Sequence, residues 1–367
     1  MKKILFASTA LVAFAGAAAA QDVGITLAGS AELGIADGGS GSDAEFFTDV
    51  EVEFILAGAT DGGLTFGTVI ELSDIDEDGV GTTDDDSDDG GVAIFVSGGF
   101  GTFTLGDTDG AYDWAMTEVL FNNGSIADNE EHAGYNGNSG LDGVYDGQIA
   151  RYDYTVGNFG IALSAEMDDG NDRSFGLDSA DRDTLFGLPV GDDDDFDDEG
   201  DGDPVYGIGL RYGVDFAGTA VNFGLGYQQA DTVFDFDVDP TAGVDLVRFN
   251  GDFDIIGVSA STSLDNGLAL GINYSQLNGD ISDDNPLTND EEDLDIDHFG
   301  IGVGYAFEPF QVSANYGEFS GDVDITGYGF TAGYDLGGGA EFQFGYGHSD
   351  DDGSKDDTYS AGISLAF

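Results

Sequence analysis

The feature that most constrains this chain is a two-residue alternation of apolar and polar side chains, sustained in segments of about ten residues or more. In 23–35 the odd positions read VILGALI and the even positions read GTASEG. The same alternation recurs in 49–56, 64–72, 159–168, 221–228, 328–346 and 359–367. One face of each segment therefore meets an apolar medium and the other a polar one, over a length that a membrane strand must keep and few soluble strands do.

The connections between these segments fall into two classes that alternate along the chain. Short Gly-rich turns lie near residues 60–63, 98–101, 157–158, 214–218, 265–267, 308–309 and 336–339. Long, mostly acidic loops lie near 37–45, 74–90, 107–147, 169–204, 230–245, 278–297, 319–324 and 348–357. The count gives about sixteen strands, an even number, with short turns on the periplasmic side and long loops outside. The pattern predicts an all-β, transmembrane antiparallel β-barrel; a soluble sandwich or a β-solenoid is disfavoured because no short repeat is visible.

The first twenty residues are typical of a secretory signal. Lys2 and Lys3 precede an apolar stretch over 4–14, and small residues at 17–20 suit cleavage before Gln21. We therefore expect residues 1–20 to be removed and 21–367 to form one barrel domain. After residue 20 no stretch of 18 residues is mainly apolar and uncharged, so no transmembrane helix is predicted.

Composition excludes several function classes. A formal net charge of −66 repels polyanions and argues against nucleic-acid binding. The chain has no cysteine, which removes disulfides, thiolate metal sites and cysteine catalysis. His132, His298 and His348 follow no metal or triad spacing, so we expect no catalytic residues and no enzyme.

Three stretches carry a family resemblance. The runs FILAGATDGGLTFG (54–67) and VSGGFGTFTLGD (96–107), together with the terminal Phe367, resemble alphaproteobacterial general porins. The resemblance implies a sixteen-stranded, water-filled pore in the outer membrane, a homotrimer, and contact with lipopolysaccharide and outer-membrane lipid. It also implies that Phe367 is read by the outer-membrane assembly machinery, and that the third loop folds inward and narrows the lumen.

The third loop, residues 107–148 (hereafter L3), is the longest and contains the only helix-like stretch, 111–121. A loop with its own amphipathic segment needs a surface to pack on, which the barrel wall supplies; a surface lid or a trimer contact is the alternative. Strand parity places Arg151 and Arg211 in the lumen, and Arg248 less clearly so, because an arginine facing lipid costs about 2–4 kcal/mol. We expect a transverse field at the constriction between these arginines on one wall and the loop acids Asp109, Asp113, Glu118, Asp128, Glu130 and Glu131. The alternative is that the arginines only neutralise neighbouring acids.

Aspartate-rich runs at 84–89, 192–199 and 350–352 offer hard oxygen ligands that suit Ca²⁺ or Mg²⁺, although none matches an EF-hand loop. Solvated loops adapted to salt are the alternative, no cofactor is required, and the metal ligands stay unknown. The sequence thus predicts passive diffusion of small hydrophilic solutes and ions, with a preference for cations. A substrate-selective channel, and a non-conducting acidic surface barrel or adhesin, remain as alternatives.

Overall fold

A computed structural model describes residues 24–39, 43–73, 91–122, 124–145, 148–167, 203–216, 218–236, 247–283 and 291–367. Sixteen strands and one short helix are present in this part of the chain. Their bounds are β1 (Gly24–Asp37), β2 (Glu45–Ala59), β3 (Thr65–Ser73), β4 (Val92–Gly98), β5 (Gly101–Gly106), α2 (Ala111–Ala115), β6 (Ile149–Val156), β7 (Phe159–Glu166), β8 (Asp203–Phe216), β9 (Thr219–Phe236), β10 (Val247–Ser263), β11 (Leu268–Asp283), β12 (Glu291–Phe307), β13 (Phe310–Gly321), β14 (Ile325–Gly337), β15 (Ala340–Asp351) and β16 (Ser354–Ala366).

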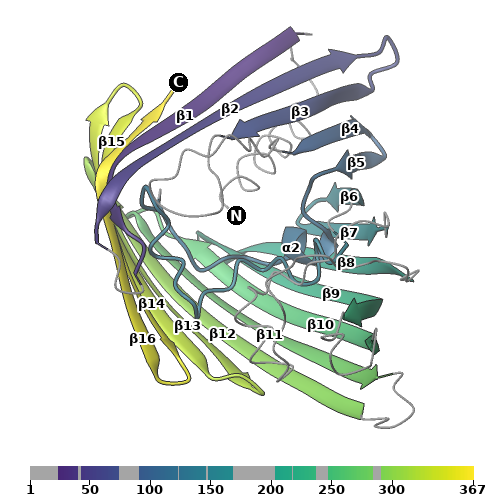
Figure 1. The fold of residues 1–367 in the computed structure, drawn as a ribbon. Helices are drawn as coiled ribbons and strands as arrows, with labels where there is room; N and C mark the ends of the chain where they lie inside the picture. The colour runs from purple at the N-terminus through teal and green to yellow at the C-terminus, as the bar shows by residue number, and fades with distance from the viewer. Residues whose placement is uncertain are drawn as a thin grey trace.

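The strands form one closed antiparallel barrel in which each strand pairs with its neighbours in the sequence (Figure 1). The barrel closes between β1 and β16, with a register that runs from Ser30 opposite Ala366 to Asp37 opposite Tyr359. Beyond the last strand, the backbone N–H of Phe367 donates to the carbonyl of Gly29 at 2.9 Å. The predicted sixteen-stranded barrel is therefore confirmed, and the terminal residue lies at its seam.

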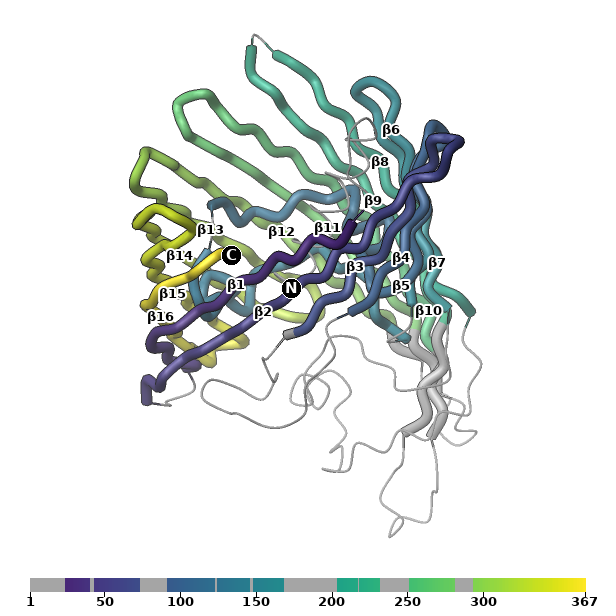
Figure 2. The backbone as a smooth tube through the Cα atoms, turned by 90° about the horizontal axis from the view of Figure 1, so that it is seen from above, coloured from purple at the N-terminus to yellow at the C-terminus, as the bar shows by residue number. Residues whose placement is uncertain are grey.

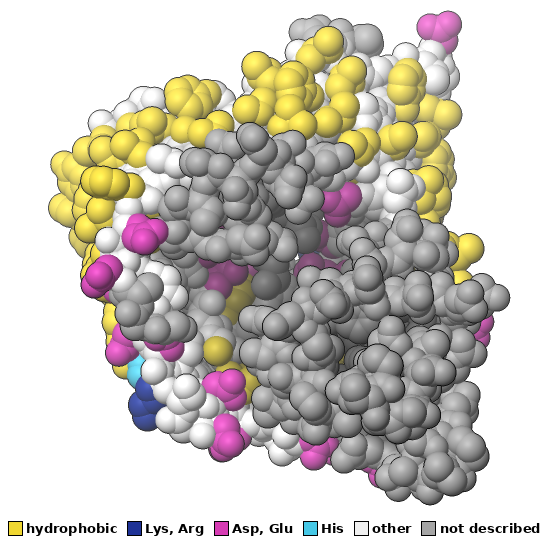
Figure 3. All heavy atoms as spheres, in the orientation of Figure 1, with side chains coloured by type: hydrophobic (Ala, Val, Ile, Leu, Met, Phe, Trp, Pro, Cys, Tyr) yellow, Lys and Arg dark blue, Asp and Glu magenta, His cyan; other side chains and the backbone are white. Residues whose placement is uncertain are grey.

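The alternation in the sequence becomes the two faces of the wall. On β1, Ile25 and Leu27 are 72% and 62% exposed on the outside, while Ala36 is buried on the inside. Large apolar side chains cover the outer surface in the same way on the other strands, as the yellow margin in Figure 3 shows. Inward positions carry glycine and small polar side chains such as Ser259, Asn273 and Thr331. A closed barrel leaves no unpaired strand edge in an apolar medium, which is the condition for crossing a bilayer with strands.

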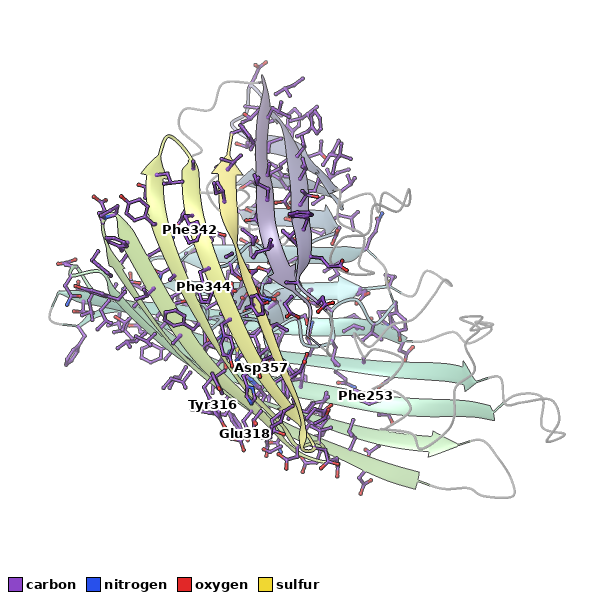
Figure 4. The ribbon with its side chains drawn as sticks, turned by 60° about the vertical axis from the view of Figure 1, so that its left-hand side comes forward. Phe253, Tyr316, Glu318, Phe342, Phe344 and Asp357 are labelled. Atoms are coloured by element: carbon purple, nitrogen blue, oxygen red, sulfur yellow. The ribbon has the colours of Figure 1, made fainter. Side chains whose placement is uncertain are left out.

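Tyrosines on the outer face pair with carboxylates near one end of the strands. The hydroxyl of Tyr316 donates to Glu318 at 2.9 Å, and that of Tyr346 donates to Asp357 at 2.6 Å. Figure 4 shows Tyr316, Glu318 and Asp357 at this end, with Phe344 and Phe342 further along. Amphipathic tyrosines of this kind occupy the interface between hydrocarbon and water.

Several predicted loops are shorter than expected because the strands continue past the apolar band. Segment 348–357 is almost entirely strand, since β15 reaches Asp351 and β16 begins at Ser354. β9 likewise extends into the segment 230–245, and β11 and β12 extend into 278–297. The alternation of apolar and polar residues ends where the strand leaves the lipid, whereas backbone pairing continues in water. The lengths of these strands were therefore underestimated from the sequence. No helix in the described residues is long and apolar enough to span a membrane.

Candidate functional site

Loop L3 leaves β5 and runs inside the ring of strands, as the blue chain in Figure 2 shows. Its outgoing half is fixed by backbone N–H groups that donate to inward-facing serines. The N–H of Ala111 donates to Ser164 on β7 at 2.8 Å, and that of Thr117 donates to Ser259 on β10 at 3.0 Å. The side chain of Asn122 then donates to a backbone carbonyl on β13 at 2.5 Å. The loop therefore follows the inner wall across several strands.

The returning half is fixed by the same kind of contact. The N–H of Ala133 donates to Ser349 on β15 at 2.9 Å, and the N–H of Leu141 donates to the amide oxygen of Gln228 on β9 at 2.8 Å. Near the end of the loop, the hydroxyl of Tyr145 donates to backbone carbonyls on β8 and β9. The predicted inward folding of L3 is thus confirmed, and the polar parity of the strands supplies its anchors.

An apolar cluster holds the base of L3 against the wall. The helix α2 is only five residues long, and the predicted helix over 111–121 is wrong beyond Ala115, because Met116 is extended with ψ 164°. The apolar residues of 111–121 are spaced as in a helix because they pack on one surface, the inner wall of the barrel. From the loop, Tyr112, Met116, Leu141, Val144 and Tyr145 pack with Val205, Ala230, Phe253 and Ile255 of the wall. Inward apolar residues on β8 to β10 are therefore explained by the loop that covers them.

Arg151 lies at the root of L3 and is 2% exposed. Its Nη1 donates to the carbonyl of Asp109 at 2.6 Å and lies 3.8 Å from that residue's carboxylate. Its Nε lies 3.7 Å from the carboxylate of Asp153. Burial raises the pKa of Asp109 to about 6, although Arg151 and Arg211 act in the opposite direction. This contact matches the alternative in which the arginine neutralises neighbouring acids rather than facing them across the lumen.

The other predicted arginines lie in different surroundings. Arg211 is exposed and its guanidinium stacks over the ring of Trp114 at 4.4 Å, so it lies above α2. Arg248 lies on β10 opposite Asp235 of β9, and its side chain is outside the described residues. The structure thus brings Arg151 and Arg211 together at the loop root and leaves Arg248 apart.

The predicted loop acids divide into two groups. Asp113 and Glu118 are near the root; burial raises the pKa of both, and neighbouring carboxylates raise that of Asp113 further. Glu118 accepts a hydrogen bond from Tyr135 on the returning half. These two carboxyls therefore lie at the packed base of the loop, where they are partly exposed.

At the loop tip, Asp128 and Glu131 are partly exposed, and their backbones join in a turn with the N–H of Glu131 on the carbonyl of Asp128. Glu130 is 1% exposed and accepts hydrogen bonds from the N–H and hydroxyl of Ser125. Its carbonyl accepts from Asn315 on β13 at 3.0 Å. Glu130 therefore holds the loop tip together and attaches it to the wall, and its carboxylate does not face the lumen as predicted.

An acidic wall lies on the first strands, and its residues were not among the predicted constriction residues. The alternation turns the polar parity of β1 to β3 inward, and the acids at these positions are Glu32, Glu45, Asp49, Glu51, Glu53 and Glu71. Glu51 accepts a hydrogen bond from the inward Ser30 at 3.2 Å. Figure 3 shows acidic side chains beside the central hollow. The signal was present in the sequence, where acids alternate with Val50, Val52 and Phe54, but was read only as evidence for a strand.

Two of the three aspartate-rich runs, 84–89 and 192–199, lie outside the described residues. In the third, the carboxylate of Asp350 pairs with Lys355 at 2.7 Å. Within the described ranges no group of three or more His, Asp or Glu side chains is arranged to hold a metal ion. Calcium in the acidic loops stays a prediction.

Comparisons with known proteins agree with this architecture. The model of the Gram-negative porin family matches residues 7–354. A porin from Rhodobacter capsulatus is 26% identical over 336 residues, covering 89% of this chain and 94% of that protein. A solved porin structure (23% identity) and a loop-deletion variant of the outer-membrane protein OmpT of Vibrio cholerae (14% identity) both superpose with a TM-score of 0.63. Each covers 94% of this chain and all of the other.

A variant of the Rhodopseudomonas blastica porin superposes with a TM-score of 0.52 at 17% identity, again over 94% of this chain and all of the other. The solved structures support the fold, and the family model carries the assignment. The resemblance to alphaproteobacterial general porins is thereby confirmed, and the chain belongs to the Gram-negative porin family as an outer-membrane β-barrel channel protein.

Proposed function

We propose that this porin is a general diffusion channel that passes small hydrophilic solutes and ions without a dedicated binding site and prefers cations. The observation that carries the preference is the sign of charge on the inner wall. Six carboxylates occupy the inward parity of β1 to β3, while the buried cation Arg151 is enclosed between Asp109 and Asp153. Rings of carboxylate in a narrow aqueous pore attract cations and exclude anions.

The test is planar-bilayer conductance of the refolded mature protein under a gradient of potassium chloride. Stable conductance steps with a cation-sided reversal potential support the proposal. Saturation of the conductance by one solute at low concentration would favour a substrate-selective channel. A folded, heat-modifiable barrel without conductance would favour the non-conducting surface barrel.

Neutralising the acidic wall is expected to weaken the selectivity. The double substitution Glu51→Gln and Glu53→Gln removes two inward charges at nearly constant volume. We expect the reversal potential to fall by roughly a third, because selectivity follows the carboxylates that line the pore. The matched control is Asp61→Asn, which removes a charge in the turn between β2 and β3 and should leave the reversal potential unchanged. Equal effects of both changes would contradict a role for this wall.

We further propose a homotrimer that buries the outer face of β1 to β5. All twelve tyrosines that lie on strands belong to β6 through β16, and none lies between residues 24 and 106. Interfacial tyrosines mark surfaces that meet lipid. A sector with exposed isoleucine, leucine, valine and phenylalanine but no tyrosine is suited to contact another protein, and a second copy is the partner that symmetry favours.

A matched pair of substitutions tests this face. Ile94 on β4 and Ile301 on β12 are both outward, with 56% and 45% exposure. Ile94→Trp is expected to disrupt a packed interface by overfilling it, whereas Ile301→Trp should be tolerated in lipid. The measurement is the oligomeric mass in detergent by light scattering: monomers for Ile94→Trp alone support the face, and intact trimers for both place the interface elsewhere.

A further inference from the structure

At five positions a backbone carbonyl of L3 lies so close to the barrel wall that the wall residue must be a glycine. A Cβ added to Gly209 on β8 would lie 1.9 Å from the carbonyl oxygen of Ala111. One added to Gly302 on β12 would lie 1.8 Å from that of Val119. Real Cβ atoms essentially never come within 3.0 Å of another atom, so no other residue fits these positions as the loop now lies.

The same arrangement is found on three further strands. The corresponding distances are 2.1 Å from Gly224 to the carbonyl oxygen of Ala115, 1.8 Å from Gly317 to that of Gly134, and 1.9 Å from Gly347 to that of Asn129. We call these five positions the glycine track: Gly209, Gly224, Gly302, Gly317 and Gly347. The track lies under both the outgoing and the returning halves of the loop.

Loop backbone groups contact the wall in several ways. The N–H groups of Ala111 and Thr117 donate to the inward serines Ser164 and Ser259. The carbonyls of Asp109 and Glu130 accept hydrogen bonds from wall side chains. Each of the five carbonyls above the glycine track lies over the second α-hydrogen of a glycine, which can form a weak C–H···O contact. Ala111 shows both, with its N–H on Ser164 and its oxygen over Gly209.

Glycine inside a strand is unfavourable, because it loses more conformational freedom on folding than other residues and has no side chain to pack. Five such residues on the inner wall of β8, β9, β12, β13 and β15 therefore call for a compensating role. The close packing of L3 against these glycines supplies such a role.

We propose that the glycine track sets the bore of the channel by letting L3 lie about one side-chain carbon closer to the wall than any other residue would allow. The proposal rests on the proposed diffusion function. A methyl group on the track must move the loop by at least about 1 Å, since contacts of 1.8–2.1 Å must open to 3.0 Å or more. The wall is continuous behind the track, so the loop can move only into the lumen, and the pore narrows.

The test uses Gly209→Ala and, as its control, Gly213→Ala. Both glycines lie on the inward parity of β8, but a Cβ on Gly213 would meet only the amide oxygen of Asn222 at 3.3 Å. In planar bilayers we expect Gly209→Ala to lower the single-channel conductance by on the order of a third. In liposome swelling it should slow raffinose more than arabinose. The control should match the wild type in both assays.

A second readout does not depend on conduction. Trp114 is the only tryptophan of the chain, lies in α2 beside Gly209, and is 6% exposed. Gly209→Ala should therefore change its emission spectrum and increase its quenching by acrylamide, while Gly213→Ala should not. If the wild type does not conduct, the proposed diffusion function is wrong, but the emission of Trp114 still tests whether L3 packs closely on the glycine track.

Wild-type conductance and wild-type emission in Gly209→Ala would overturn the proposal, and so would a rise in conductance, since the loop would then leave the lumen. If Gly209→Ala does not fold, Gly302→Ala and Gly347→Ala replace it, because they lie on other strands under other parts of the loop. If these two variants fold and show the conductance and sugar permeation of the wild type, the proposal is overturned as well.

Discussion

Replacing Arg151 with methionine is expected to release the root of L3 and to lower the stability of the folded protein by about 3–5 kcal/mol, the usual cost of leaving one partner of a buried ion pair uncompensated. The side chain is 2% exposed and reaches two carboxylates and one carbonyl. Methionine keeps an unbranched apolar stem but is shorter, and it removes the charge and every donor. The measurement is thermal unfolding of the folded barrel in detergent, followed in parallel by Trp114 emission.

The control is Arg211→Met. Arg211 is exposed and its main contact is the face of Trp114 at 4.4 Å. An exposed cation–π contact contributes about 0.5–1 kcal/mol, so this variant should be nearly as stable as the wild type. Adding Asp109→Asn to Arg151→Met should recover part of the loss, because it removes the carboxylate left without its partner. A single Arg151→Met variant that melts with the wild type would show that the pair does not hold the loop.

The sequence was sufficient for the barrel because one physical constraint acts on every strand. Alternation in 23–35 and 359–367 predicted two strands that the structure pairs into the seam of the barrel. The same parity turned Arg151 inward, and it lies buried on the lumen side. It could also have revealed the acidic wall, since Asp49, Glu51 and Glu53 share one parity. Local patterns of this kind need no knowledge of the rest of the fold.

The interior of L3 could not be predicted in this way. Whether Glu130 points to the lumen or to Ser125 depends on the path of the loop. That path depends on contacts with distant strands, such as that of Ala133 with Ser349, which lies 216 residues away in the sequence. The alternation of apolar and polar residues also cannot predict that the carbonyl of Val119 lies directly above Gly302. The outer ends of β9, β11 and β12 were missed for a related reason, because backbone pairing continues beyond the apolar band.

Lowering the pH from 8 to 5 is expected to tighten the docking of L3. Burial raises the pKa of Asp142 to about 7, above an ordinary value of 3.8, although the N–H of Gly110 and the amide of Gln228 donate to its carboxylate. The docked loop therefore binds a proton that the released loop loses. A raised pKa contributes stability that is complete below pH 4 and is lost as the pH rises through 7. Asp109, with a pKa of about 6, acts in the same direction.

His132 acts in the opposite direction. It is 6% exposed, and burial lowers its pKa from 6.5 to about 4. A lowered pKa favours docking above pH 6.5, and this contribution is lost as the pH falls through 4. Each group changes the docking free energy by at most about 1.4 kcal/mol per pH unit within its own window. Burial raises the pKa of Glu131 on the same loop to about 8, so this carboxyl acts with the two aspartates. The loop carboxyls outweigh this histidine between pH 6 and 4, and the net effect of acid is tighter docking.

The quenching of Trp114 by acrylamide, recorded from pH 8 to 5, measures this change. We expect quenching to decrease as the pH falls. Asp142→Asn cannot ionise, although it keeps only one of the two acceptor oxygens, so it should show a flatter profile. His132→Gln removes the opposing group and should steepen the profile between pH 6.5 and 4. Quenching that increases on acidification in the wild type would mean that the histidine, rather than the buried aspartates, controls the loop.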